Sequence, residues 1–208
     1  MIAIIDYGVG NLFSLKSSFA AIGADAAITA DPAAIRRADG VILPGVGAFR
    51  DAAAKLRGSG LWNVVTAEAE AGKPLLGICL GMQMLFGKSY EYGEHEGLGL
   101  ISGAVRPIAD VIPKTFKIPH IGWNALHLTK PSPLFANVKE GDYVYFVHSY
   151  YAADCADSVI ATADYGAPLT AAVQRGNVMG CQFHPEKSGD VGLSILRAFC
   201  SLAKGAAQ

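Results

Sequence analysis

The chain has 208 residues, of which 51% are hydrophobic, and a formal net charge of −1. This length and composition predict one domain with a substantial core. The near-neutral charge gives no sequence-wide attraction to nucleic acid or to an anionic membrane. No apolar run approaches the ~20 residues of a membrane span, and the start MIAIIDYG lacks the basic region of a signal peptide. We therefore expect a cytoplasmic protein with neither a nucleic-acid nor a membrane partner.

The first half of the chain alternates strand and helix patterns. IAIID (2–6) predicts a strand that ends in a glycine-containing turn, and Asn11 lies at the N-cap position of a helix over LFSLKSSFAAIG (12–23). Asp31 and Pro32 are typical of the cap and the first turn of a second helix.

Three further segments have the pattern of a strand, a helix and a strand, in that order: ADGVILPG (38–45), GLWNVVTAEAEAG (60–72) and KPLLGIC (73–79). Continuously apolar strands separated by helices indicate a parallel sheet that is covered on both faces.

After about residue 98 the pattern changes to strands joined by short turns, which favours antiparallel pairing. The strand-like segments are HIGWNALHL (120–128), DYVYFVHSYYAA (142–153), SVIATADYG (158–166), LTAAVQRG (169–176) and NVMGCQFH (177–184). A closing helix is expected over GDVGLSILRAFCSLA (189–203). The sequence thus predicts an α/β fold with a mostly parallel central sheet flanked by helices and an antiparallel extension in the second half.

Neither a nucleotide site nor a metal site is indicated. Three G-x-G stretches, at 8–10, 45–47 and 97–99, lack the third glycine of a dinucleotide fingerprint and are predicted to be tight turns. The cysteines are far apart and include no C-x-x-C pair, which argues against zinc and against a disulfide framework: Cys79, Cys155, Cys181 and Cys200.

Cys79 lies where an apolar strand pattern meets a helical one, in PLLGICLGMQMLF (74–86), with Gly77 and Gly81 two residues to either side. This is the setting of a nucleophile elbow, a strained strand-to-helix turn that leaves no room for side chains two residues away. The helix N-terminus would favour a thiolate, and the N–H of Leu80 would face a developing oxyanion. The alternative is a buried core cysteine.

A thiolate nucleophile needs a base, and the chain has five histidines. His95 in a polar loop and His127 in an alternating strand give no sign of chemistry, and His120 is ambiguous. His148 and His184 each end an apolar strand, where the sites of α/β sheets are built.

Of these two, His184 has the better surroundings, because Glu186 follows two residues later across Pro185. In an extended segment residues i and i+2 point the same way, so Glu186 could orient and charge-stabilise the imidazole. The alternative is a capping histidine beside a solvated carboxylate. The chain order Cys79, His184, Glu186 suits acyl transfer through a thioester.

The motifs GICLGMQ (77–83) and QFHPEKSG (182–189) resemble the class I, triad-type glutamine amidotransferases, whose cysteine attacks the side-chain amide of glutamine. Further stretches resemble one branch, the glutaminase subunits of imidazole glycerol phosphate synthase in histidine biosynthesis: IDYGVGNLFSLKSSF (5–19), LPGVGAF (43–49), HIGWN (120–124) and YFVHSYY (145–151). The match spans nearly the whole chain in order. Pyridoxal phosphate synthase glutaminases would have a GGES-like run at LPGVG, and those of anthranilate or GMP synthase a GGPG-like one.

This resemblance implies a flavodoxin-like glutamine amidotransferase domain over residues 1–208 that hydrolyses L-glutamine to glutamate and ammonia. It makes Cys79 the nucleophile, His184 the general acid and base, and Glu186 the orienting carboxylate. The oxyanion site would comprise the turn and helix residues Gly45, Val46, Gly47 and Leu80. A peptide flip between the two glycines of the turn would be sterically cheap.

The resemblance also implies binding residues and a partner. The positions that would hold the glutamine ammonium and carboxylate are Gly47, Gln83, Glu91, His148, Ser149 and Tyr150. Read without the resemblance, Glu91 is a solvated loop charge. Tyr145 and Lys187 match positions at the interface with a cyclase subunit, a (β/α)₈ barrel in a heterodimer, near the ammonia exit. That cyclase would make imidazole glycerol phosphate and an aminoimidazole carboxamide ribotide, and no metal or organic cofactor is implied.

Three other hypotheses stay open at this point. The chain could serve a different synthase, which the GVG run disfavours. It could be a cysteine peptidase or a redox-stress protein with the same elbow, although those would lack the paired His184 and Glu186. It could also be an inactive subunit that only scaffolds a partner, against which the intact Cys79, His184 and Glu186 argue.

Overall fold

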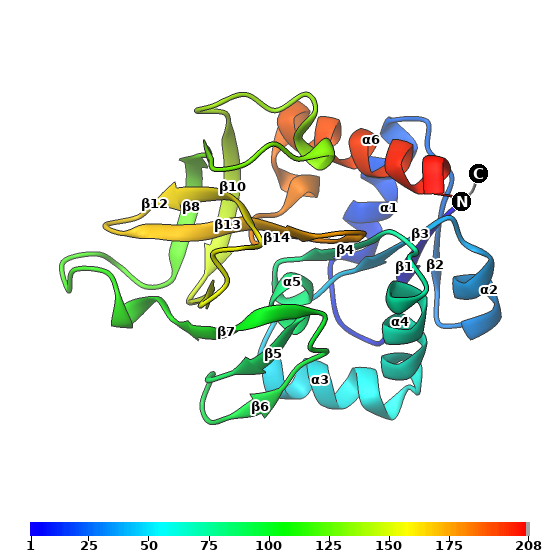
Figure 1. Cartoon of the computed structure of the whole chain (residues 1–208), viewed down its shortest axis with the longest axis horizontal. Helices are drawn as coiled ribbons and strands as arrows, with labels where there is room; N and C mark the ends of the chain where they lie inside the picture. The colour runs from blue at the N-terminus through cyan, green and yellow to red at the C-terminus, as the bar shows by residue number, and fades with distance from the viewer. Residues whose placement is uncertain (207–208) are drawn as a thin grey trace.

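The structure is a computed structural model that describes residues 1–206 (Figure 1). A sheet of eight strands forms the centre of the fold. Five neighbouring strands run parallel, in the order β2 (Ala26–Thr29), β1 (Ile2–Ile5), β3 (Gly40–Leu43), β4 (Leu75–Ile78) and β14 (Val178–Cys181). The sheet continues antiparallel through β13 (Pro168–Arg175), β12 (Val159–Asp164) and β9 (His127–Leu128). The mostly parallel sheet with an antiparallel extension is the arrangement that the sequence predicts.

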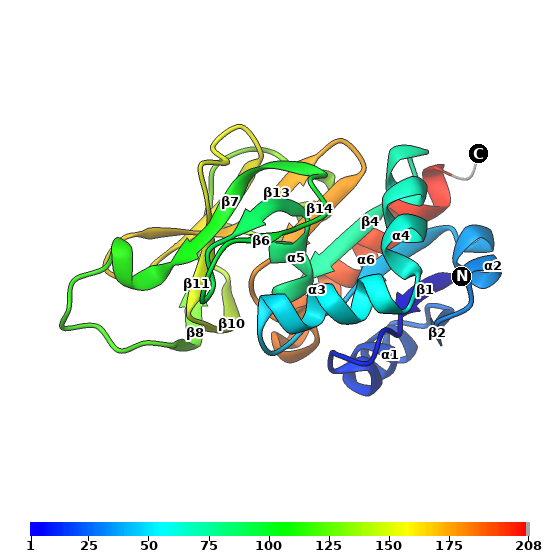
Figure 2. The same cartoon turned by 90° about the horizontal axis from the view of Figure 1, so that it is seen from below.

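Helices cover both faces of this sheet, as Figures 1 and 2 show. One face carries α1 (Leu12–Ala21) and α6 (Gly189–Ala206); the other carries α2 (Pro32–Arg37), α3 (Phe49–Gly58), α4 (Leu61–Glu70) and α5 (Leu80–Met84). Four of the parallel strands are buried along their whole length: β1, β3, β4 and β14. This is why their sequences are continuous apolar runs.

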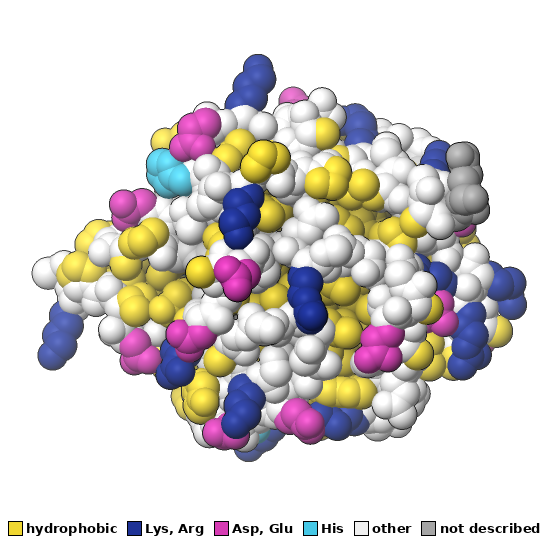
Figure 3. Space-filling view, in the orientation of Figure 1, with side chains coloured by type: hydrophobic (Ala, Val, Ile, Leu, Met, Phe, Trp, Pro, Cys, Tyr) yellow, Lys and Arg dark blue, Asp and Glu magenta, His cyan; other side chains and the backbone are white. Residues whose placement is uncertain are grey.

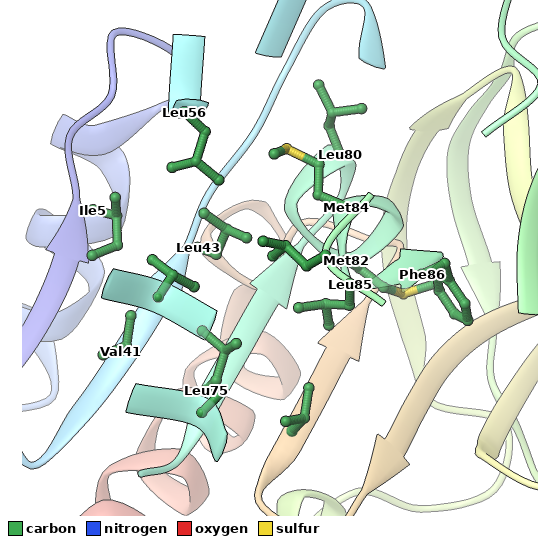
Figure 4. Close-up of a cluster of buried hydrophobic side chains, with 14 of the residues drawn as sticks. Ile5, Val41, Leu43, Leu56, Leu75, Leu80, Met82, Met84, Leu85 and Phe86 are labelled. Atoms are coloured by element: carbon green, nitrogen blue, oxygen red, sulfur yellow. The ribbon is translucent and has the colours of Figure 1, made fainter. Parts of the chain in front are cut away.

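A hydrophobic cluster between the sheet and α3–α5 holds the site's supporting elements together. In Figure 4, Leu43 of β3 and Leu75 of β4 face Leu56 of α3 and Met82 of α5. These side chains are at most 1% exposed. Burying a side chain of this size contributes about 1.5–3 kcal/mol, so the cluster fixes α5 firmly on the sheet.

Two smaller sheets lie at the end of the molecule away from α2 (Figure 2). One has the order β11 (Tyr150–Ala153), β7 (Ile101–Pro107), β5 (Phe86–Ser89), β6 (His95–Glu96). The other pairs β8 (His120–Ala125) with β10 (Tyr143–His148). Residues 1–206 also contain three 3₁₀ turns: Ile108–Asp110, Pro133–Phe135 and Pro185–Lys187.

Several predicted elements are divided differently. The single strand expected over residues 142–153 breaks at Ser149, because β10 pairs with β8 whereas β11 pairs with β7. The strand expected over 120–128 likewise divides after Ala125. The helix expected over MQMLF ends at Met84, and Phe86 begins β5 instead. These differences arise because an apolar pattern does not reveal where a strand changes its pairing partner. The sequence interpretation also missed the strands β2 and β5–β7.

The two predicted helix caps have different outcomes. Asp31 caps α2 as expected, since its carboxylate accepts the N–H groups of Ala33 and Ala34. Asn11 occupies the N-cap position of α1, but its side chain makes no capping hydrogen bond.

The parallel strands deliver their carboxyl ends to one edge of the sheet. Tyr7 follows β1, Pro44 follows β3, Cys79 follows β4 and His184 lies three residues beyond β14. Ligand sites of α/β sheets lie beyond this edge, so the topology brings together residues that are far apart in the sequence.

Candidate active site

Cys79 lies on a strained turn between β4 and α5. Its backbone angles are φ 55° and ψ −113°. A Cβ on Gly77 would lie 2.7 Å from the carbonyl oxygen of Gly81, and one on Gly81 would lie 1.8 Å from the carbonyl oxygen of Leu43. Both glycines are therefore required for the turn to pack, and the strained strand-to-helix turn expected around Cys79 is present.

The Cys79 side chain lines a cavity of about 490 Å³ at the sheet edge. The N–H of Leu80, the first residue of α5, donates to no acceptor within residues 1–206 and is one of the orphan donors of a helix start. Because α5 has only five residues, its dipole contributes less to a thiolate than a long helix would.

His184 and Glu186 form a buried hydrogen-bonded pair at the same cavity. Nδ1 of His184 lies 2.8 Å from Oε1 of Glu186, and their side chains are 3% and 1% exposed. The expected pairing is confirmed, although through a 3₁₀ turn that begins at Pro185 rather than an extended segment. Because Glu186 accepts from Nδ1, only Nε2 of His184 remains free for chemistry in the cavity, and within residues 1–206 this atom makes no hydrogen bond.

The surroundings of His184 stabilise its protonated form. Burial lowers the pKa of His184, but its interactions with Cys79 and Glu186 outweigh burial and raise the pKa to about 9. At neutral pH His184 is therefore protonated, and a cationic imidazole is the kind of neighbour that activates a cysteine nucleophile.

The turn after β3 borders the cavity beside Leu80. A Cβ on Gly45 would lie 2.7 Å from the backbone nitrogen of Gly81, so this glycine packs directly against α5. Gly47 has φ +88°, and Val46 is 42% exposed. The N–H groups of Gly45, Val46 and Gly47 donate to no acceptor within residues 1–206. Of these three residues, Val46 and Gly47 line the cavity.

All six residues matched to glutamine binding line this cavity: Gly47, Gln83, Glu91, His148, Ser149 and Tyr150. Glu91 is only 8% exposed, so the interpretation as a solvated loop charge is wrong. Its Oε2 accepts the N–H of Phe49, the first residue of α3, at 2.6 Å. Burial raises the pKa of Glu91, and this backbone hydrogen bond opposes the rise.

His148 has a different role from His184, because both of its ring nitrogens are already bonded. Nδ1 donates to the carbonyl oxygen of Tyr150 at 2.8 Å, and Nε2 accepts from Nδ1 of His120 at 3.0 Å. The Tyr150 carbonyl also accepts Nε2 of Gln83 at 3.1 Å. The ring of His148 thus orders the Tyr150 peptide rather than facing the cavity with a free donor.

The sequence interpretation missed two residues of the site. Gln182 is fully buried. Its Oε1 accepts Nε2 of Gln83 at 3.0 Å, and its Nε2 donates to the sulfur of Cys79 at 3.7 Å. Tyr7 is 5% exposed, and its hydroxyl donates to the carbonyl oxygen of Pro44. A polar residue at the end of an otherwise apolar strand was the available signal for Gln182.

Tyr145 and Lys187 lie beside the triad rather than in the cavity. The ammonium of Lys187 is 5.8 Å from the centroid of the Tyr145 ring. The carbonyl of Tyr145 accepts the N–H of His184 at 3.0 Å, which links β10 to the triad.

The described residues contain no group of three or more His, Cys, Asp or Glu arranged to hold a metal ion. Over residues 1–206 no helix is long and apolar enough to cross a membrane. On the face seen in Figure 3, basic side chains are interspersed with acidic ones rather than gathered by sign.

A strained cysteine, a buried histidine–glutamate pair and unbonded N–H groups around one cavity are the parts that thiol-dependent acyl transfer requires. A family model for class I glutamine amidotransferases matches residues 3–201. The chain belongs to this family. It is 49% identical over 203 residues to the imidazole glycerol phosphate synthase subunit HisH of Syntrophotalea carbinolica, covering 96% of this chain and 98% of the relative. It is 50% identical over 208 residues to the HisH subunit of Geobacillus sp., covering 99% and 98%.

Solved structures agree on the fold. A crystal structure of a glutamine amidotransferase has a TM-score of 0.76 at 21% identity, covering 98% of this chain and 100% of that one. PurLQS from Thermotoga maritima has a TM-score of 0.73 at 20% identity, covering 97% of each chain. The α/β fold inferred from the sequence is therefore confirmed.

Proposed function

We propose that this chain is the glutaminase subunit of an imidazole glycerol phosphate synthase in histidine biosynthesis and hydrolyses L-glutamine through a γ-glutamyl thioester on Cys79. The observation that carries the proposal is the meeting of Cys79 with the hydrogen-bonded His184–Glu186 pair in one cavity at the ends of β4 and β14. The identities of 49% and 50% to two HisH subunits over nearly the full length support the choice of synthase.

The chemistry follows from the proton positions. The Cys79 thiolate attacks the amide carbon of the glutamine side chain, and the carbonyl oxygen becomes an oxyanion that accepts from the Leu80 N–H and an N–H of the turn at Val46. Nε2 of His184 protonates the departing amine, which leaves as ammonia. His184 then takes a proton from water, which attacks the thioester and releases glutamate and the thiolate. Glu186 holds the Nδ1 proton throughout.

The binding of glutamine uses the opposite wall of the cavity. Oε1 of Glu91 has no donor within residues 1–206 and would accept the α-ammonium, while Oε2 stays on Phe49. The N–H of Ile108 donates to the carbonyl of Ser149, so in the antiparallel β11–β7 pair the neighbouring Tyr150 N–H points to the other edge, toward the cavity. It would donate to the α-carboxylate.

The outer face of the β8–β10 pair is the proposed docking surface for the cyclase subunit, a (β/α)₈ barrel. Three large side chains on this face are more than half exposed: Ile121, Trp123 and Tyr143, at 58%, 55% and 58%. The register aligns Tyr145 with Trp123 on the same face, next to Lys187. Exposed aromatic clusters of this kind mark protein interfaces, and this one adjoins the triad from which ammonia would leave.

The test measures steady-state glutamate release from the subunit alone, with a cyclase subunit, and with the cyclase and its nucleotide ligand. We expect poor activity alone, because a turn that points a carbonyl at the oxyanion position lacks one donor. Losing one such donor typically costs ~10²–10³ in rate, so the complete complex should be faster by about that factor. Cys79→Ala is the control and should abolish release. Full activity of the subunit alone would refute its activation by the cyclase. The absence of glutamate release in all three conditions would refute the proposed glutaminase activity.

A further inference from the structure

The hydroxyl of Tyr7 contacts Pro44, the first residue of the proposed oxyanion turn (residues 44–47). This hydroxyl donates to the carbonyl oxygen of Pro44 at 2.6 Å, a strong hydrogen bond in a buried setting. The sulfur of Met84 in α5 lies 3.7 Å from the same hydroxyl oxygen. The tyrosine therefore lies between the turn and the short helix that carries the Leu80 N–H.

The hydroxyl of Tyr7 is a permanent donor. Burial raises its pKa well above the usual range, and the nearby Cys79 raises it further. The phenol thus keeps its proton at any working pH. Its ring belongs to the same hydrophobic cluster as Leu43 and Leu80, which prevents it from swinging away from Pro44.

The other end of the turn is also held. The Phe49 N–H, at the start of α3, donates to the buried carboxylate of Glu91. Between Pro44 and Phe49, the N–H groups of Gly45, Val46 and Gly47 have no acceptor within residues 1–206. The turn is thus fixed at both ends and free in the middle.

A flip that is confined to one peptide unit requires the peptide units on either side to be held in place. Rotating the Gly45–Val46 peptide changes ψ of Gly45 and φ of Val46 while the planar units on either side stay in place. If the Pro44 carbonyl were free, the same rotation could spread into the Pro44–Gly45 peptide, and the Val46 N–H would miss the oxyanion. A misplacement of about 1 Å can reduce a rate by ~10²-fold.

We propose that Tyr7 is a positioning residue for thioester formation, holding the Pro44 carbonyl so that reorientation is confined to the Gly45–Val46 peptide. The inference rests on the proposed glutaminase function and adds to it a residue that touches neither glutamine nor the triad. Its effect is exerted on the transition state, where the oxyanion forms, and not on the binding of glutamine.

The test compares two reactions of the same sulfur in Tyr7→Phe, assayed in the complex with cyclase and nucleotide ligand. Phenylalanine fills the same space and removes only the hydroxyl. We expect kcat for glutamine hydrolysis to fall about tenfold with KM within twofold, as for the loss of an interaction made only in the transition state. Alkylation of Cys79 by iodoacetamide develops no carbonyl oxyanion, so its rate should stay within twofold of wild type.

Ser158→Ala is the matched control, since Ser158 is also buried and its hydroxyl donates to the carbonyl of Cys155 at 2.9 Å, away from the cavity. It should leave kcat unchanged. Incorporating 4-aminophenylalanine at position 7 restores an N–H donor and should recover most of kcat.

An unchanged kcat in Tyr7→Phe would overturn the inference, as would equal losses in hydrolysis and alkylation or a failure of the amino variant to recover. Failure of the proposed function would be recognised separately, by the absence of glutamine hydrolysis in the wild-type complex.

Discussion

The backbone of Cys79 shows how one residue is forced into a reactive position. A non-glycine residue at positive φ costs roughly 1–3 kcal/mol and persists only where its surroundings over-determine it. The Cys79 N–H donates to the carbonyl of Cys181 at 2.7 Å, and the glycines at 77 and 81 allow β4 and α5 to close around the turn. The strain aims the sulfur into the cavity.

Three buried histidines near the site differ in their partners and therefore in charge. Burial lowers the pKa of His120 to about 4 and that of His148 to about 3. His184 is also buried, but its pairing with Cys79 and Glu186 raises its pKa to about 9. Only His184 is thus held in the protonated form that a leaving amine requires.

We predict that His184→Ala reduces kcat of the complex by about 10²–10⁴-fold, the usual contribution of general acid–base catalysis. His127→Ala should reduce it less than twofold, because His127 is exposed and its imidazole pairs with Glu140 away from the cavity. Glutamate release measures both, with circular dichroism to verify folding. Comparable losses in two folded variants would mean that His184 is not the base.

At the scale of elements, the turn between β3 and α3 is less free than its two glycines suggest. Val46 is not among the residues with positive φ. Flipping the Gly45–Val46 peptide by about 180° would carry φ of Val46 into the left-handed region, which a β-branched residue strongly disfavours. The flip is therefore sterically cheap for the rotation about ψ of Gly45, as the sequence suggested, but not for the rotation about φ of Val46.

Val46→Gly should accordingly raise the glutaminase rate of the isolated subunit by about three- to tenfold, because removing strain of about 1–3 kcal/mol is partly offset by the flexibility of glycine. The stimulation by cyclase and ligand should shrink in proportion. Val46→Ala, which keeps a Cβ, is the control and should give a smaller gain. An isolated Val46→Gly subunit no faster than wild type would contradict this account of the turn.

At the scale of the whole molecule, the buried histidines make stability depend on pH in both directions. The folded-state pKa values of His120 and His148 lie below the unfolded value of about 6.5, so the unfolded chain takes up protons first as pH falls, and stability is lost. The folded-state pKa of His184 lies above 6.5, so its contribution is present below pH 6.5 and is lost as pH rises toward 9.

We therefore predict a maximum of unfolding free energy near pH 6.5, measured by urea denaturation. Between about pH 6 and 4.5 the free energy should fall by roughly 2 kcal/mol per pH unit, since two extra protons bind the unfolded chain. His120→Gln should reduce this slope by about half. A flat profile across this range would show that the histidines titrate normally in the folded protein.

Local sequence pattern determined those features that depend on neighbours along the chain. The buried parallel strands read as apolar runs, the Asp31 cap formed where its spacing predicted, and the glycines around Cys79 indicated the elbow. The motifs also identified the family. In each case the physical cause lies within a few residues, so the sequence carries it directly.

Only the tertiary structure decided which distant groups meet. The break of one apolar run at Ser149 depends on β8 and β7, which lie elsewhere in the chain. Glu91 became a buried acceptor because α3 begins beside it, and Tyr7 reached Pro44 because β1 and β3 are neighbours in the sheet. Burial lowers the pKa of His120 and His148, and the approach of Cys79 helps to raise that of His184; neither can be read from a residue's own surroundings in the sequence.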